Sequence, residues 1–167
     1  MVDERSQVTI ENKESIMPYT VTVKEVPTIT VASLRIHTDL ASIATDLAGG
    51  FGQVGAAVGG PPAGAPFVIF HDVIDEETDG DIEICFPVPE PIEASGDVTS
   101  RELEGGSMVT TVHKGPYDQV SPAYHTLTGW VQEHGHQFAG PPREIYLNDP
   151  TTVDPGEILT EIQWPIS

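Results

Sequence analysis

A carboxylate and an aromatic ring lie two residues apart in a short strand-like stretch near the C-terminus. The stretch is GPPREIYLNDP, and it carries Glu144 and Tyr146 between a Gly-Pro turn and an Asn-Asp-Pro turn. Because side chains alternate along a strand, these two share one face, and Ile145 points to the other. Two interpretations are open at this point: a solvated edge strand, or the floor of a binding cleft.

The chemistry of this pair depends on its burial. A carboxylate held among aromatic faces would attract a delocalised cation, and each ring would add about 0.5–2 kcal/mol of cation–π attraction. Burial would also raise the pKa of Glu144, so that it could serve as a general acid or base. A solvated edge-strand glutamate would do neither.

Other chemistry-bearing residues lack the spacing of a reaction centre. The six histidines are dispersed and form no H-x-x-x-H or comparable ligand pattern. The single cysteine, Cys85, lies in a strand-like run and is expected to be a small core residue. No G-x-S-x-G elbow or P-loop is present. We therefore expect no metal and no cofactor.

The elements that would position Glu144 occur twice in the chain. An offset of 76 residues aligns APFVIFHD with PPREIYLND, and an offset of 78 aligns DIEICFPV with LTEIQWPI. The matched pairs include Phe70 with Tyr146, Phe86 with Trp164, and Glu83 with Glu161. Glu83 and Glu161 are expected to be structural or surface residues. The repeat indicates two halves related by a pseudo-twofold axis.

Each half is predicted to run strand, helix, strand, strand. The expected elements are 28–36, 38–58, 66–72 and 81–88 in the first half, and 106–114, 115–135, 142–148 and 157–166 in the second. We expect Thr38 or Asp39 to cap the first helix. An extra strand is expected over 19–27. The stretch 49–66 is either a lid over the cleft or an irregular insertion.

These elements predict an α+β fold of duplicated β-α-β-β units with pseudo-twofold symmetry. A mostly antiparallel sheet would carry two main helices, with a central ligand cleft at the seam. We expect one domain over 15–167, with halves at about 15–90 and 105–167. Residues 1–14 are expected to be a flexible lead or an edge segment.

The charge is strongly one-sided. There are 26 acidic residues against 7 basic ones, which gives −19, and the acids are dispersed. Molar salt shortens the Debye length to about 3 Å and screens such repulsion, so we expect a halophilic, cytoplasmic protein. No basic patch exists to neutralise phosphates, which excludes nucleic acid as the expected partner. No apolar run reaches the roughly 18 residues of a membrane span.

Most of the chain resembles the GyrI-like small-molecule-binding family, whose fold is shared with effector-binding domains of AraC-type and MerR-type regulators. The matching motifs are KGPY (114–117), AYHTLTGW (123–130), GPPREIYLNDP and TEIQWPI (160–166), and the likeness extends over about 19–166. It implies a cleft for hydrophobic, often cationic molecules with a carboxylate at its base. Glu144 matches that position, with Tyr146 beside it.

The resemblance leads to three functional hypotheses. The first is a stand-alone binder of a hydrophobic or cationic molecule, acting in sensing or sequestration. The second is a hydrolase of reactive, cyclopropanoid-type molecules, with Glu144 activating water; we favour binding over catalysis. The third is a protein-interaction or inhibitor module. The predicted ligand-binding residues are Glu144, Tyr146, Phe70, Trp164, Phe86 and Tyr117.

Overall fold

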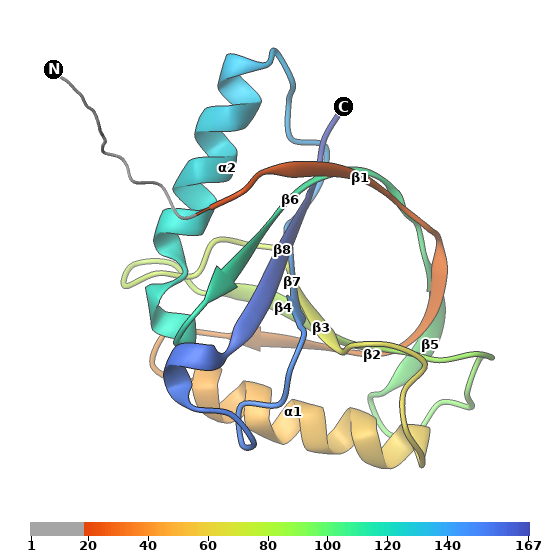
Figure 1. Ribbon diagram of the computed structural model, residues 1–167. Coiled ribbons are helices and arrows are strands. Elements are labelled where there is room, and N and C mark those ends of the chain that lie inside the picture. Colours follow the sequence, from red (N-terminus) through yellow and green to blue (C-terminus); the bar gives the residue numbers. More distant parts are fainter. Residues whose placement is uncertain (1–18) are drawn as a thin grey trace, which may run out of the picture.

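The computed structural model describes residues 19–167, an α+β fold with two helices on an antiparallel sheet (Figure 1). The strands are β1 (Thr22–Val26), β2 (Ile29–Thr38), β3 (Phe67–Phe70), β4 (Gly80–Pro87), β5 (Thr99–Leu103), β6 (Gly106–Lys114), β7 (Arg143–Tyr146) and β8 (Leu159–Pro165). The helices are α1 (Ile43–Val58) and α2 (Ser121–Glu133), with short 3₁₀ turns η1 (Tyr117–Gln119) and η2 (Pro155–Glu157). The expected lead over 1–14 lies outside the described residues.

All strands join one sheet in the order β1-β6-β8-β7-β3-β4-β2-β5. Exchanging β1 with β5, β2 with β6, β3 with β7 and β4 with β8 reverses this order and changes nothing else. The topology is therefore compatible with the duplication expected from the sequence. β5 was not predicted, and it is the counterpart of the extra strand β1.

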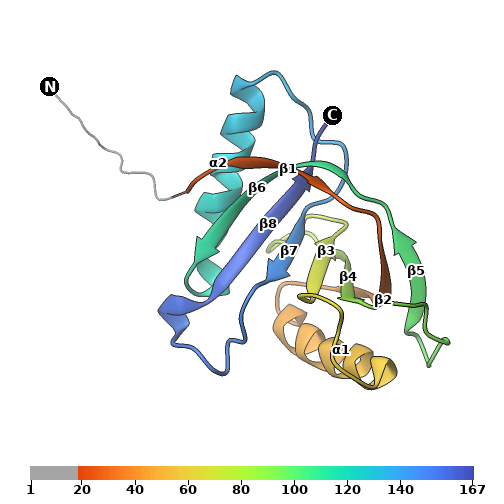
Figure 2. The same cartoon turned by 45° about the vertical axis from the view of Figure 1, so that its right-hand side comes forward.

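The two edge strands are exchanged between the halves. β1 precedes the first half but pairs with β6 of the second, and β5 precedes the second half but pairs with β2 of the first. The turns at their ends meet, because the Gly105 amide donates to the Thr28 hydroxyl at 3.1 Å. A Cβ at Gly105 would lie only 1.9 Å from the Val26 carbonyl oxygen. The sheet is thus curled, and the connection from β1 to β2 lies against the connection from β5 to β6 (Figure 2).

Helix α1 begins later than predicted and ends at the predicted residue, Val58. It starts at Ile43 instead of Thr38 or Asp39, because residues 40–42 form a turn in which the Asp39 carboxylate accepts the Ser42 amide at 2.9 Å. The Gly-rich stretch after Leu47 is helical up to Val58, so the expected loop over 49–66 begins only at Gly59. Gly50 explains this, since its bare Cα faces Ile84 and allows close helix–sheet packing.

Helix α2 is preceded by a separate turn. The predicted helix over 115–135 divides into η1 and α2, and Pro122 occupies the first turn of α2, where its missing amide costs no hydrogen bond. Gly135 follows the helix with a φ of 72°, as a glycine stop requires. The helix buries Ala123, Leu127 and Val131.

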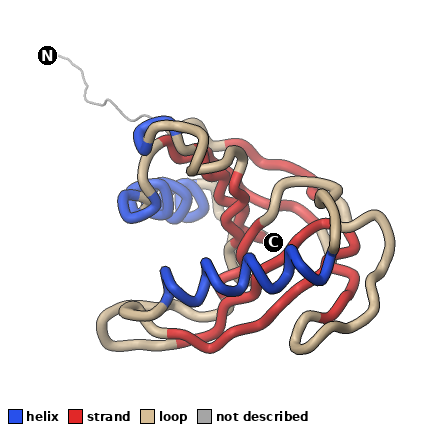
Figure 3. Tube along the Cα trace, turned by 90° about the horizontal axis from the view of Figure 1, so that it is seen from below, coloured by secondary structure: helices blue, strands red, loops and turns tan. Residues whose placement is uncertain are grey.

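Both helices pack on one face of the sheet, and the opposite face lines the inside of the curl (Figure 3). On that inner face, the Arg101 guanidinium forms two hydrogen bonds to Glu83, at 3.0 and 2.8 Å. The Lys24 ammonium contacts Glu161 at 2.5 Å. Each cation comes from an exchanged edge strand. Glu83 and Glu161 are therefore buried structural residues, and neither is a surface residue.

Candidate functional site

Strand β7 places Glu144 at the seam between the halves. Glu144 is the direct cross-strand partner of Val68 on β3 and of Ile162 on β8. Val68 is also its repeat counterpart at the 76-residue offset. The side chain points to the helix-bearing face, and only 8% of the residue is exposed. The interpretation of a solvated edge strand is therefore wrong, because β7 lies in the middle of the sheet.

Two tyrosine hydroxyls donate to this carboxylate. Tyr124 of α2 reaches Oε2 at 2.6 Å, and Tyr146 of β7 reaches Oε1 at 3.5 Å. Hydrogen bonds from neutral donors to a carboxylate are expected to be near the shorter of these distances. The Tyr124 contact is therefore the strong one, and it ties the helix directly to the sheet.

Burial has the largest effect on the pKa of the Glu144 carboxyl group. It raises the pKa of Glu144, although the hydrogen bonds from Tyr124 and Tyr146 and the field of His113 oppose the rise. Burial, followed by the charge of Glu144, raises the pKa of Tyr124 and of Tyr146 above the usual tyrosine value. Both phenols therefore stay protonated and act as donors.

A cavity of about 620 Å³ opens beside Glu144, between α2, the chain after β3 and the loop before β7. This volume suits a drug-sized molecule. The lining residues are Phe70, His71, Asp72, Val73, Ile74, Val120, Ser121, Tyr124, His125, Phe138, Gly140, Pro141, Pro142, Glu144 and Trp164. Both halves contribute, as expected for a cleft at the seam.

One wall of the cavity is an ordered aromatic cluster. Trp164 stacks on Phe138 with 3.7 Å between ring centroids, and Tyr124 meets the Trp164 ring edge-on at a centroid distance of 5.6 Å. The Trp164 indole donates to the Gly140 carbonyl at 3.1 Å, which fixes the ring. The cavity therefore offers π-faces beside a buried carboxylate.

The six predicted binding residues divide into two groups. Glu144, Phe70 and Trp164 line the cavity. Tyr146 and Phe86 do not, because they pack against Phe51 of α1, each with 5.9 Å between ring centroids. Tyr117 does not line it either: its ring is exposed and meets the Tyr146 ring edge-on at 5.4 Å. Tyr146 still reaches Glu144 through its hydroxyl. The binding roles of all six remain predictions.

Sequence reasoning overlooked Tyr124 and Phe138. Tyr124 belongs to the helical stripe that also contains Leu127 and Val131, and this spacing by itself predicts an ordinary packing residue. A buried tyrosine hydroxyl needs a hydrogen-bond partner, and that requirement was the available signal. Phe138 lies in a loop whose path no local pattern reveals.

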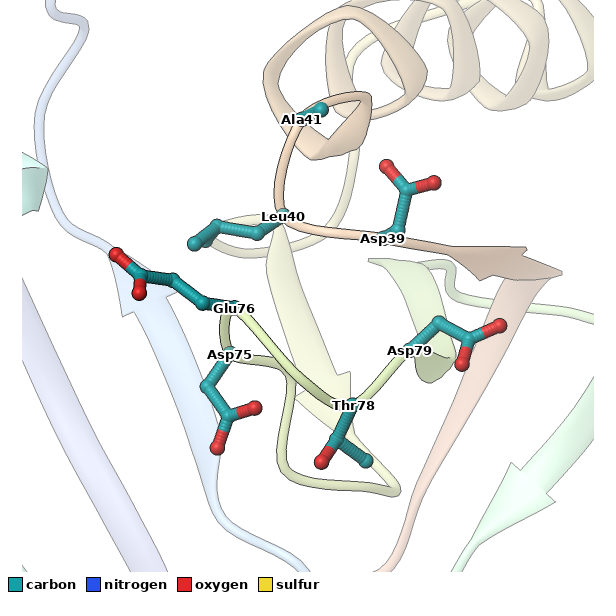
Figure 4. A pocket seen from close by; sticks show the side chains of 7 residues that line it. All are labelled: Asp39, Leu40, Ala41, Asp75, Glu76, Thr78 and Asp79. Carbon is teal, nitrogen blue, oxygen red and sulfur yellow. The ribbon is translucent and has the colours of Figure 1, made fainter.

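A second hollow, of about 550 Å³, lies between the β2–α1 turn and the β3–β4 loop. It is lined by Asp39, Leu40, Ala41, Asp75, Glu76, Thr78 and Asp79. Figure 4 shows that its carboxylates point in different directions. Within residues 19–167, no group of three or more His, Cys, Asp or Glu side chains could hold a metal ion. None of the described helices is long and apolar enough to cross a membrane.

Comparisons with known proteins agree on one family. The family described as GyrI-like small molecule binding domain matches residues 19–167. The crystal structure of the EcmrR C-terminal domain is 30% identical, with a TM-score of 0.81, and the match covers 90% of this chain and 99% of that one. The EcmrR–DNA complex is 31% identical, with a TM-score of 0.79, and covers 93% of this chain and 60% of that one.

A more distant structure shares the fold. SAV2435, solved bound to tetraphenylphosphonium, is 12% identical, with a TM-score of 0.64, and the match covers 89% of this chain and 94% of that one. A comparison with curated protein sequences finds no match.

Proposed function

Because this chain belongs to the GyrI-like small-molecule-binding family, we propose that it binds a hydrophobic cation in the cavity beside α2, with Glu144 as the charge partner. The observation that carries the proposal is the position of Glu144: a carboxylate only 8% exposed that lines a cavity walled by aromatic rings. The physiological role would be sensing or sequestration of such a molecule. The halophilic origin expected from the charge remains a prediction.

The energetics favour a cation over a neutral ligand. A buried carboxylate has lost much of its hydration, and a bound cation returns part of that stabilisation. The faces of Trp164 and Phe138 add cation–π attraction, about 0.5–2 kcal/mol for each ring. The tetraphenylphosphonium bound by SAV2435 is a ligand of this chemical type, and it supports the proposal by analogy of fold.

The test is calorimetric titration with tetraphenylphosphonium in molar KCl. We expect saturable binding that weakens about tenfold or more in Glu144→Gln, which keeps the shape and removes the charge (roughly 1.4 kcal/mol or above). Glu161→Gln is the matched control, because it removes a buried carboxylate on the opposite face of the sheet. It should change the affinity less than twofold.

The pH dependence gives a second readout. Since burial raises the pKa of Glu144, protonation begins at a higher pH than for an ordinary glutamate. The affinity for tetraphenylphosphonium should therefore fall as the pH drops through that raised pKa, and Glu144→Gln should abolish the dependence. Equal binding by wild type and Glu144→Gln would remove Glu144 from the site, and no binding by either would overturn the proposal.

A second candidate, a hydrolase, is favoured by the 2.6 Å contact between Tyr124 and Glu144. Glu144 would take a proton from water as the water oxygen bonds to a strained ring carbon. Tyr124 would give its proton to the atom released by ring opening, and Glu144 would then return one to Tyr124. Incubation with a cyclopropane electrophile followed by mass spectrometry tests this candidate. A water adduct formed by wild type but not by Glu144→Gln would support it.

A further inference from the structure

We infer that Tyr124 is a specificity-determining residue: by occupying Glu144 with its hydroxyl, it makes the cavity select cations without N–H groups over protonated amines. The inference deepens the proposed function and rests on it. It concerns which cations the same carboxylate accepts.

The protein's own tyrosines already form hydrogen bonds to the carboxylate. Tyr124 donates to Oε2 at 2.6 Å, and Tyr146 lies 3.5 Å from Oε1. Each carboxylate oxygen therefore has a phenol directed at it. The negative charge remains, but the oxygen that faces the helix is occupied by a short hydrogen bond.

Tyr124 is held in this position. Its ring meets Trp164 edge-on, with an interplanar angle of 75°, and Trp164 is itself fixed by its bond to Gly140 and by Phe138. Its backbone belongs to α2, which packs on the sheet through Leu127 and Val131. Moving the Tyr124 oxygen away from Oε2 would require the ring to shift within this cluster, so a ligand does not displace it freely.

The two kinds of cation respond differently to this arrangement. A quaternary ammonium or phosphonium ion spreads its charge over carbon-bound hydrogens and needs no hydrogen-bond acceptor. It gains the field of Glu144 and the aromatic faces and leaves Tyr124 in place. A protonated amine needs acceptors for its N–H groups and competes with the Tyr124 hydroxyl for Oε2, so it must weaken that short bond or accept less favourable hydrogen bonds. An unsatisfied buried donor lowers affinity by about tenfold or more.

The rim offers an amine little compensation. Asp72, His71, Ser121 and His125 are the other polar side chains on the cavity wall. Asp72 is exposed and already accepts the Asp81 amide at 2.9 Å, and His71 bonds to Glu83 at 2.9 Å. Contacts with an exposed carboxylate contribute little because water competes for both charges. Selectivity therefore arises at Glu144.

The experiment compares two probes that share one framework, 2-naphthylmethylamine and its N,N,N-trimethyl derivative. Both are titrated by calorimetry in molar KCl at about pH 8, where the amine is still protonated. The proteins are wild type, Tyr124→Phe and Tyr19→Phe. Tyr19→Phe is the matched control, because its hydroxyl bonds to His113 and does not line the cavity. Glu144→Gln reports whether the proposed site is used at all.

We expect wild type and Tyr19→Phe to prefer the trimethyl probe by about tenfold or more. In Tyr124→Phe the amine should gain about tenfold, because the freed Glu144 oxygen accepts its N–H, and the trimethyl probe should change less than threefold. If both probes weaken equally in Tyr124→Phe, Tyr124 only packs, and the inference is overturned. If neither probe binds wild type, or Glu144→Gln binds both unchanged, the proposed function fails instead.

Discussion

Under α2 the sheet presents Glu144 to a cavity of about 620 Å³, whereas under α1 it presents the repeat counterpart Val68 to a packed core. In the first half the space is filled by Phe51, which contacts both Phe86 and Tyr146. In the second half the counterpart of Phe86 is Trp164, and it stacks on a loop residue instead. The buried strand carboxylate therefore lies beside a cavity under α2, whereas its counterpart Val68 is packed under α1.

The comparison shows how one fold separates stability from binding. An apolar strand residue allows a helix to close down on the sheet, and close packing then stabilises the domain. A buried carboxylate is unfavourable in such a core, and here it is accommodated by hydrogen bonds from Tyr124 and Tyr146 and by the adjoining cavity. Three pairs of substitutions test this contrast, in order of decreasing expected effect.

Truncation of the filling ring should have the largest effect. Phe51→Ala is expected to lower the free energy of unfolding by about 2–3 kcal/mol, somewhat below a fully buried phenylalanine because Phe51 is half-buried. Phe138→Ala is the control in the second half. It should lower the free energy of unfolding by about half as much, since the Phe138 ring borders a cavity. Urea unfolding measures both. Equal costs would mean that the two halves are packed alike.

The two inner-face ion pairs should also differ between the halves. Burial by itself would raise the pKa of Glu83, but hydrogen bonds from Arg101, His71 and Ser33 outweigh it and lower that pKa to about 2. Arg101→Met should therefore cost about 2 kcal/mol at neutral pH. Lys24→Met should cost about 1 kcal/mol or less, since Lys24 is 47% exposed.

The pH dependence of the stability lost in Arg101→Met follows from the lowered pKa of Glu83. A lowered folded-state pKa contributes stability that is present above the unfolded value, near 4.5, and is lost as the pH falls towards about 2. The difference between wild type and Arg101→Met should shrink across this window in urea titrations. A difference that stays constant with pH would assign the cost to lost packing of the Arg101 stem.

Adjacent glycines of α1 provide the smallest and most local test. Gly50→Ala would place a Cβ 2.2 Å from the Ile84 side chain and should destabilise by about 1–2 kcal/mol. Nothing lies within 4 Å of a Cβ at Gly49, so Gly49→Ala should stabilise by about 0.5–1 kcal/mol. Thermal unfolding compares them. Stabilisation by both would show that α1 does not depend on close approach.

Much of the fold could be predicted because both halves repeat the same periodicities. The strands β2, β4, β6 and β8 lie within about two residues of their expected bounds, since β-branched runs are unambiguous. The start of α1 was missed because an aspartate can cap a turn as well as a helix. β5 was missed because Thr99–Leu103 contains mostly polar residues and becomes a strand only by pairing with β2.

The candidate site was only partly predictable for a similar reason. Glu144 could be identified because it lies in a motif whose neighbours are regular. Its partner Tyr124 is 20 residues away on another element, and the 2.6 Å contact depends on how α2 docks. The placement of Tyr146 and Phe86 against Phe51, and of Tyr117 against Tyr146, likewise depends on which ring fills the first half. Such contacts are set by tertiary packing, which no local pattern encodes.

The exchanged edge strands have a kinetic consequence. Val26 of β1 is paired with Gly106 of β6, and Ile29 of β2 is paired with Leu103 of β5. Each pairing therefore encloses the long stretch of chain between its two strands. β1 has no partner among the described strands until β6 has been synthesised, and β2 gains its outer partner only when β5, which follows β4, has been made. Loop closure over such separations is entropically unfavourable and slows the search for the native state. During synthesis β1 therefore remains an unpaired edge segment until the second half emerges, whereas β2 to β5 can pair with one another earlier.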